Sequence, residues 1–424
     1  MPSAALLDQP QEQLSLDKLA SGSDDGRPGG DDAALTELLT SIRRHLHRHP
    51  EVGMQEHDTS RFLRETLERY GLDVHGPVAE TGFWVDIGGT TSSANGRPPR
   101  VGYRADIDAL PMQDAKSVSY HSRADGVAHL CGHDAHSAVG VGVALLLHAR
   151  REQLPSGGGV RVFFQPNEES VPSGAPMMID DGVLDGLDTV YAIHVDPTLE
   201  IGRYGLKTGP ITASSDRFDI TVRGRGSGHS ARPHEAVDAV WIANQVMQAL
   251  YQLAGRITDP RHAAVLTLCR LEGGQAHNVI PPEASFGGTL RTVKEKDRNF
   301  LREKMQRVAE ETAALYGGTA ELDLMTGAPP VVNDAEAVAA ARRAIEAHFG
   351  PEAVYDIPKT SMGAEDFAYY LREVPGALLR VGTQSGPETR FPLHDGRFDI
   401  DEHALAPTAR LMADLLEARL GDGG

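Results

Sequence analysis

The chain has 424 residues, which is enough for two or three domains. Hydrophobic residues make up 40% and charged residues 24% of it, as in an ordinary globular protein, so a chain that is disordered throughout is excluded. Asp and Glu number 60 against 41 Lys and Arg, a net charge of −19. Because this charge repels phosphate backbones and anionic lipid, we expect binding to neither nucleic acid nor membranes.

The cysteine content and the apolar runs indicate a cytoplasmic protein. Cys131 and Cys269 are the two cysteines, which excludes a disulfide framework and favours a reducing compartment. Cys269 lies in an apolar run, so we expect it in a core. No apolar run approaches the ~18 residues that cross a bilayer. Residues 1–31 are rich in Gly and Asp and lack a secretory signal, so we expect a disordered leader there.

The elements that follow predict an α/β domain. Apolar residues recur at three- and four-residue spacing from Asp32, and a second helix is expected over 58–70. Two short strands, a long apolar helix and two strands of parallel-sheet character come next, over 82–89, 101–110, 133–150, 159–166 and 189–195. Strands that alternate with helices in this way are typical of a mostly parallel sheet.

A different pattern begins near residue 212. An alternating strand, an amphipathic helix, two strands, a charged helix and a closing strand follow, over 216–226, 236–255, 263–274, 284–293, 295–317 and 319–327. This β-α-β-β-α-β order is that of the split βαβ, or ferredoxin-like, unit.

The α/β pattern then returns, with a helix over 335–348, a strand over 376–382 and a helix over 406–420. We therefore predict one catalytic domain of residues 32–211 and 328–424, interrupted by a small domain of residues 212–327.

Histidines cluster in the predicted catalytic domain. His45, His47 and His49 fall at the end of the first helix, where we interpret them as surface or capping groups, because imidazolium suits the helix dipole. Cys131 and His133 are separated by one residue before the long apolar helix. A thiolate and an imidazole so placed can face one ion of the zinc or manganese type. A C-x-H pair alone leaves a buried cysteine beside a helix start as an equal alternative.

Acidic and imidazole groups also stand at the ends of predicted strands. Glu168 and Glu169 follow the strand over 159–166, at the edge where open α/β sheets place their sites. One of two adjacent carboxylates can bind an ion while the other takes a proton from the attacking water. His194 ends an apolar strand and His394 lies in a polar turn, and each fits a structural role by itself. Together with the thiol and imidazole above, they form the set that a metal hydrolase needs.

The inserted domain contributes three further candidates. His229, in the flexible turn GSGHSARPH, is placed to stabilise an oxyanion. Asn278 and Arg291 are suited to a substrate carboxylate, the guanidinium through a two-point fork. The alternatives are a turn-forming role for His229 and the support of a turn before Pro281 for Asn278.

Nine motifs occur in the order found in a known family. They are RRHLHRHPE, YRADIDALP, CGHDAH, FQPNEE, ASSDRF, GHSARPH, NVIPPEA, AEDFA and HDGRFDID, and they extend from about residue 32 to residue 420. In them the chain resembles the M20 metallopeptidase superfamily. Within that superfamily it is most similar to the branch of N-acyl-amino-acid amidohydrolases that includes hippurate hydrolase and plant auxin-conjugate hydrolases.

The resemblance implies a two-metal catalytic domain with a βαββαβ lid, and a homodimer formed through the lid. The ligand positions of the family correspond here to Cys131 as the shared ligand and to His133, Glu169, His194 and His394. Two divalent ions per subunit follow from this, with Zn or Mn expected and Co or Ni also compatible with these ligands.

The resemblance also implies roles in the reaction. Glu168 resembles the general base, and Asp106 resembles the carboxylate that orients a ligand or the metal site. His229 looks like the lid histidine that assists the tetrahedral intermediate, in many relatives across a dimer interface. Asn278 and Arg291 look like carboxylate or transition-state contacts. The implied reaction is hydrolysis of an N-acyl amino acid to a carboxylic acid and a free amino acid.

Departures from the family's motifs leave the substrate open. FQPNEES has Asn167 and Ser170 where Ala and Gly are common, AEDFA has Ala364 where Ser is common, and HLCGHD departs from the usual Met-His-Ala-Cys order. A dipeptidase or aminopeptidase of the same superfamily and an N-acetyldiaminopimelate deacetylase are alternatives. A catalytically silent metal- or metabolite-binding protein is a third. The adjacent carboxylates argue against it, because a binding module does not need an uncoordinated base.

Overall fold

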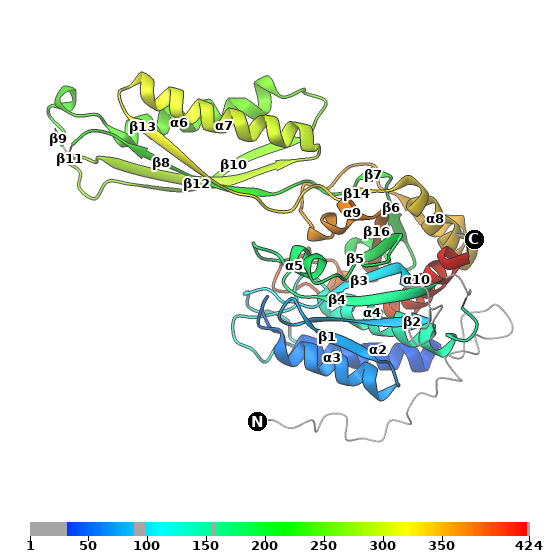
Figure 1. The fold of residues 1–424 in the computed structure, drawn as a ribbon. Coiled ribbons are helices and arrows are strands. Elements are labelled where there is room, and N and C mark those ends of the chain that lie inside the picture. Colours follow the sequence, from blue (N-terminus) through cyan, green and yellow to red (C-terminus); the bar gives the residue numbers. More distant parts are fainter. Residues whose placement is uncertain (1–31, 89–98, 155–157, 227, 422–424) are drawn as a thin grey trace. The chain divides into compact units, whose positions relative to one another are not determined.

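The computed structural model describes residues 32–88, 99–154, 158–226 and 228–421, so the leader predicted over residues 1–31 lies outside the described residues (Figure 1). The chain divides into two compact units, each described here by itself. The first comprises the described residues up to Thr208, Asn333–Pro358 and the chain from Tyr370 onward. The second comprises Gly209–Val332 and Lys359–Tyr369.

The division differs from the predicted one mainly in Lys359–Tyr369, which the sequence placed in the catalytic domain. This segment hydrogen-bonds to the inserted unit through its backbone. The amide of Ser361 donates to the carbonyl of Ile211 (2.9 Å), and Gly363 accepts from the amide of Ala213 (3.0 Å). These contacts join residues about 150 positions apart, so local sequence patterns could not predict them.

The first unit is built around one large sheet. Its strands are β1 (Val74–Val78), β2 (Gly82–Gly88), β3 (Pro99–Asp106), β4 (Gly159–Gln165), β5 (Thr189–Glu200), β6 (Tyr204–Leu206), β15 (Val354–Asp356) and β16 (Gly376–Gln384). Among the described residues these eight strands have the order β1-β2-β4-β3-β5-β16-β6-β15 (Figure 1). The central strands β4, β3, β5 and β16 are mutually parallel, whereas β1, β2 and the β16–β6 pair are antiparallel. The predicted mixed α/β class with a mostly parallel sheet is confirmed.

The helices of this unit cover the sheet and supply its core. They are α2 (Asp32–Arg48), α3 (His57–Arg69), α4 (His133–Ala149), α5 (Gly174–Asp180), α8 (Ala335–Phe349), α9 (Tyr370–Glu373) and α10 (Leu405–Gly421). α4 packs against α2, α10 and β3, and its residues from His133 to Leu147 are all buried. Such burial explains why its sequence is apolar on every side instead of amphipathic.

The second unit has the predicted β-α-β-β-α-β order. It consists of β8 (Asp216–Arg223), α6 (Ala239–Gln252), β10 (Ala264–Gly273), β12 (Glu283–Thr292), α7 (Glu295–Leu315) and β13 (Thr319–Met325), with a short pair formed by β9 (Gly228–His229) and β11 (Val279–Ile280). Its four-stranded sheet has the antiparallel order β10-β12-β8-β13. The expectation of a buried Cys269 was wrong: this cysteine is exposed, at the point in β10 where the register with β12 shifts between Leu268 and Arg270.

Among the helices of the described residues, none combines the length and the apolar character needed to cross a bilayer.

Candidate metal centre

Cys131 and His133 lie at the start of α4, on either side of a glycine that brings them against β5. Gly132 has a φ of +89°, and a Cβ at this position would lie 2.3 Å from Cγ2 of Val195. A side chain here would therefore both strain the backbone and collide with the strand. The glycine between the two candidate ligands allows both to approach the middle of β5, beside Val195.

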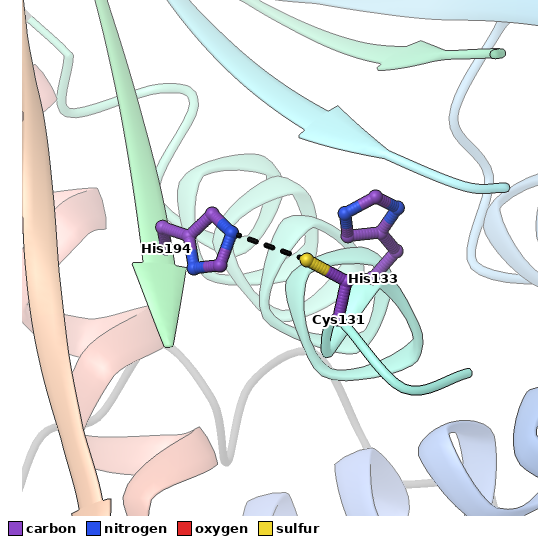
Figure 2. A group of neighbouring side chains, drawn as sticks. All are labelled: Cys131, His133 and His194. Carbon is purple, nitrogen blue, oxygen red and sulfur yellow. Dashed lines mark hydrogen bonds between the residues drawn. The ribbon is translucent and has the colours of Figure 1, made fainter. Parts of the chain in front are cut away.

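His194, on β5, faces the thiol of Cys131. Figure 2 shows the two side chains turned toward each other. Sγ of Cys131 and Nε2 of His194 are 3.5 Å apart. Nδ1–H of His194 donates to the carbonyl of Val195 (2.8 Å), which fixes the ring and leaves Nε2 with its lone pair. Both side chains are buried.

Asp108 orients the third member of this group, His133. Nδ1–H of His133 donates to the carbonyl oxygen and to Oδ1 of Asp108, each at 3.0 Å, so that Nε2 is the nitrogen left for an ion. Oδ2 of Asp108 accepts from the backbone N–H of Glu169 (3.0 Å). One carboxylate thus holds two of the predicted ligands. The sequence analysis did not identify it, although Asp108 stands two residues beyond Asp106 in the same motif.

Asp106 is buried in a different set of contacts. Its Oδ1 accepts from Nδ1–H of His136 (2.7 Å), its Oδ2 accepts from Nη1 of Arg104 (2.5 Å), and Nε2 of His133 lies 3.7 Å from Oδ2. Burial opposes the charged form, but Arg104 and the two histidines outweigh it and hold the pKa of Asp106 well below its usual range. Nε2 of His136 accepts from the N–H of Val195 (2.9 Å), so both nitrogens of that ring are engaged.

Glu168, Glu169 and His394 complete the group from two further segments. Nε2 of His394 lies 3.2 Å from Oε1 of Glu169. The backbone N–H of His394 donates to the carbonyl of Leu130 (2.8 Å), which ties the C-terminal segment to the residue before Cys131. The five predicted ligands and the predicted base therefore belong to one unit and adjoin one another.

These residues form overlapping sets of ligand atoms, each set within 4.8 Å. Three of the sets contain at least two of the predicted ligands: Cys131, His133 and His194; Cys131, Glu169 and His394; and His133, Glu168 and Glu169. Cys131 belongs to the first two sets, His133 to the first and third, and Glu169 to the second and third.

The donor atoms fit divalent metal. Nε2 of His133 and Oε1 of Glu169 are buried and make no hydrogen bond to any described residue, although Oε1 of Glu169 faces Nε2 of His394 at 3.2 Å, so both atoms are open to an ion. A sulfur and a nitrogen bound to one zinc at ordinary bond lengths and a tetrahedral angle are about 3.6 Å apart. The 3.5 Å between Sγ of Cys131 and Nε2 of His194 matches that separation.

The electrostatics of the site also favour a cation. Burial, followed by the charge of Glu169, raises the pKa of the Cys131 thiol well above its usual value. Burial, followed by the charge of Arg380, holds the pKa of His194 well below its usual value, so this imidazole is neutral. A thiolate at this position needs a positive partner, and a neutral imidazole is the form that binds metal.

A buried ionic network fixes the end of α4 that carries these ligands. Nε of Arg43 donates to Oδ2 of Asp134 (2.8 Å), and Nδ1–H of His47 donates to the same oxygen (2.7 Å). Arg43 also donates to Oδ1 of Asp399 (2.7 Å). The interpretation of His47 as a surface or capping group was therefore wrong, because this ring is fully buried against α4. Its i, i+4 spacing from Arg43 was the signal for a shared buried face.

The three candidates of the inserted domain lie in the second unit. His229 pairs with Val279 across β9 and β11, beside Asn278, whose carbonyl accepts from the N–H of Ser230 (3.0 Å). Arg291 lies near the C-terminal end of β12, one residue before the strand ends at Thr292. It donates from Nη1 to the carbonyl of Met362 (2.9 Å). The roles of His229, Asn278 and Arg291 stay predictions.

Comparison with known proteins identifies the family. The model of peptidase family M20/M25/M40 matches residues 102–418, three quarters of the chain. The chain belongs to this family. It is 37% identical to an N-acetylcysteine deacetylase of Bacillus subtilis over 91% of this chain and 97% of that protein. It is 32% identical to a thermostable carboxypeptidase of Saccharolobus solfataricus over 88% and 92%.

A solved structure supports the same assignment. The crystal structure of a Bacillus subtilis protein described as a dinuclear metal-binding peptidase of the M20 family matches with a TM-score of 0.79 and 34% identity. The match covers 92% of this chain and 99% of the other. As a member of the M20 family, the chain is a hydrolase of amide C–N bonds that acts on a small molecule with the help of metal ions.

Proposed function

We propose that this M20-family hydrolase cleaves the amide of N-acyl amino acids and releases a carboxylic acid and a free amino acid. The observation that carries the proposal is the pair of donor sets that share Cys131, with Glu168 next to them. Glu168 belongs to one set with His133 and Glu169, so its carboxylate lies beside the proposed ligands, and we assign it the role of base.

The proposed ligands of two divalent ions are Cys131, His133, Glu169, His194 and His394. When bound, the ions supply a water molecule of lowered pKa and polarise the amide carbonyl. Glu168 removes a proton from the attacking water and later delivers it to the nitrogen of the leaving amino acid. Asp108 keeps the ring of His133 and the backbone of Glu169 in place during these steps. Zn or Mn suits this mixture of thiolate, imidazole and carboxylate, with Co or Ni also admitted.

A reducing compartment suits this site. Cys131 must be a thiolate to bind an ion, and oxidation would remove that ligand. We propose a cytoplasmic location on this ground.

The N-acyl amino acid is favoured as the substrate by the deacetylase relative and by the polar groups of the second unit. Arg291 presents a guanidinium that binds a carboxylate through two hydrogen bonds, and Asn278 presents an amide. A free α-carboxylate is the feature that N-acyl amino acids share, whatever their acyl group.

A homodimer through the second unit accounts for the separation of its candidate residues. His229 and Asn278 lie where β12 begins, and Arg291 lies eight residues along this strand from Glu283, a distance of ~26 Å at ~3.3 Å per residue. One small substrate cannot touch both ends of the strand. We propose that Arg291 acts on the substrate of its own subunit and that a second copy provides His229. Exposed apolar side chains on the unit, such as Trp241 and Leu271, suit such an interface.

The experiment that tests the function is a hydrolysis panel with metal analysis. Purified protein loaded with Zn²⁺ or Mn²⁺ is given acetyl-, benzoyl- and indoleacetyl-amino acids, and unmodified dipeptides in parallel. We expect turnover of the acylated compounds, loss of it on chelation, and recovery when metal is restored. Preferential cleavage of dipeptides would instead support a peptidase, the activity named for the Saccharolobus relative.

A further inference from the structure

The turn that carries Glu168 is held in an unusual backbone conformation. Asn167, which precedes Glu168, has a φ of +52°, in the left-handed region. Asparagine enters this region at lower cost than alanine or most other residues.

Asn167 is turned into the protein and away from any substrate. Only 3% of its surface is exposed. Its Nδ2 donates to the carbonyl of Pro172 (2.7 Å), and its own carbonyl accepts from the N–H of Gly174 (2.8 Å). The side chain therefore ties together the two ends of its own loop and is not available to choose between substrates.

A separate segment supports the turn from the other side. Oε1 of Glu56, a fully buried carboxylate, accepts from the backbone N–H of Asn167 (2.9 Å), and Oε2 of Glu56 accepts from the hydroxyl of Thr81 (2.8 Å). Gly53 leaves room for the amide, because a Cβ at Gly53 would lie 1.9 Å from Oδ1 of Asn167. No side chain can be accommodated there while the asparagine keeps its position.

The same segment is joined to the strand end that holds the ligands. The N–H of Ala109 donates to the carbonyl of Glu51 (2.8 Å), and Val52 forms a parallel bridge with Ala109. Ala109 follows Asp108, whose carboxylate accepts from the N–H of Glu169. Glu168 therefore stands between two residues whose backbones are each fixed by a buried carboxylate.

We propose that Asn167, seated on Gly53 and Glu56, is a positioning residue that sets where the carboxylate of Glu168 stands relative to the ions and the attacking water. The inference rests on the proposed function, because Glu168 is its base. A displacement of about 1 Å in such a group can cost about a hundredfold in rate. The ligands are held by other contacts, so the effect falls on the chemical step and spares the binding of metal and substrate.

The first test compares kcat, KM and bound metal in Asn167→Ala, Glu56→Ala and Glu56→Gln. We expect kcat to fall about ten- to a hundredfold in the two alanine variants, with KM and metal content within about twofold of wild type. Glu56→Gln retains most of the rate, because an amide oxygen still accepts from the N–H of Asn167. Ser170→Ala, an exposed change in the same loop, is the matched control and leaves kcat unchanged.

The second test is a double-mutant cycle on metal-free protein, followed by chemical unfolding. Gly53→Ala destabilises the protein because its methyl group meets Oδ1 of Asn167, and Asn167→Gly in the same chain removes that collision. We expect the double variant to be no less stable than Gly53→Ala alone, and to restore folding if the single variant does not fold.

The outcomes separate the two proposals. A wild-type protein that hydrolyses nothing in the panel refutes the proposed function. An active wild type with an unchanged kcat in Asn167→Ala, a loss confined to KM or metal content, or additive losses in the cycle refutes the positioning role.

Discussion

At the scale of single residues, the centre depends on which atom each side chain leaves available. Two imidazoles, His133 and His194, each donate from Nδ1 to a neighbouring oxygen, and each therefore presents Nε2 toward Cys131. The residue types could be read from the sequence. The tautomers could not, because they depend on acceptors such as Asp108 that only the folded chain brings near.

Glu168→Gln separates metal binding from catalysis. The amide cannot remove a proton, so we expect turnover to fall by about a hundredfold or more, whereas bound metal stays at the wild-type level because Glu168 is not needed as a ligand. Steady-state rates and metal content of the same preparation provide the measurement. A rate close to that of wild type would exclude Glu168 as the base.

Asp108→Ala removes the acceptor that orients His133. We expect the affinity for Zn²⁺ or Mn²⁺ to fall about ten- to a hundredfold, the usual consequence of losing the partner of a ligating histidine. Calorimetric titration of metal-free protein measures it. Asp188→Ala, an exposed carboxylate of the same unit that pairs with Arg100, is the control and is expected to bind metal normally. Equal affinities in the two variants would contradict the role given to Asp108.

At the scale of elements, the site stands where separate segments end against one another. α4 begins at the carboxyl end of β3 and beside the middle of β5, and Gly132 lets it approach β5 closely enough for the ligands to meet. The burial of α4 and the order of strands and helices in the second unit were predictable from the sequence. The spacing of apolar residues along a segment indicates its secondary structure and which of its faces are buried. The ionic network of Arg43 and Asp134 was not, because its members are 91 residues apart.

The contact between the start of α3 and the loop after β4 predicts a pH effect on stability. Burial, followed by the charge of Asp108, raises the pKa of Glu56 from 4.5 to about 7. The folded state thus binds this proton more tightly than the unfolded state does. The free energy of unfolding falls between about pH 4.5 and pH 7 and stays lower above pH 7, by about 3 kcal/mol.

Glu56→Gln removes this titration. We expect denaturant unfolding of the metal-free variant to show a flatter dependence on pH across that range than wild type, with the variant the more stable of the two at pH 8. Parallel curves for the two proteins would contradict the raised pKa of this carboxyl.

At the scale of the whole molecule, our proposal assigns catalysis to groups from both units and from two copies of the chain. This can be tested by complementation between Glu168→Gln and His229→Ala, each of which should be nearly inactive alone. In a mixed dimer, one site has both an intact base and an intact partner histidine. Co-expressed in equal amounts, the two should regain about a quarter of wild-type activity, since half of the dimers are mixed and one of their two sites is complete.

The matched control is co-expression of Glu168→Gln with Asp108→Ala. Both lesions lie in the first unit, so each site of the mixed dimer carries one of them, and this pair is expected to regain no activity beyond that of the separate variants. A second control is co-expression of Glu168→Gln with a chain that carries both Glu168→Gln and His229→Ala. No site in that dimer is complete, so no activity should be regained. Activity no higher than the sum of the separate variants in the first pair would refute the sharing of His229.

The sequence by itself determined the two types of sheet, the insertion of one unit into another and the residue types of the centre. These follow from periodicity and from motif order, which are local properties. The tertiary structure alone decided that Asp108 orients His133, that His47 is buried, that Lys359–Tyr369 accompanies the inserted unit and that Cys269 is exposed at a sheet edge. Each of these depends on which distant segments pack together, and no local pattern carries that information.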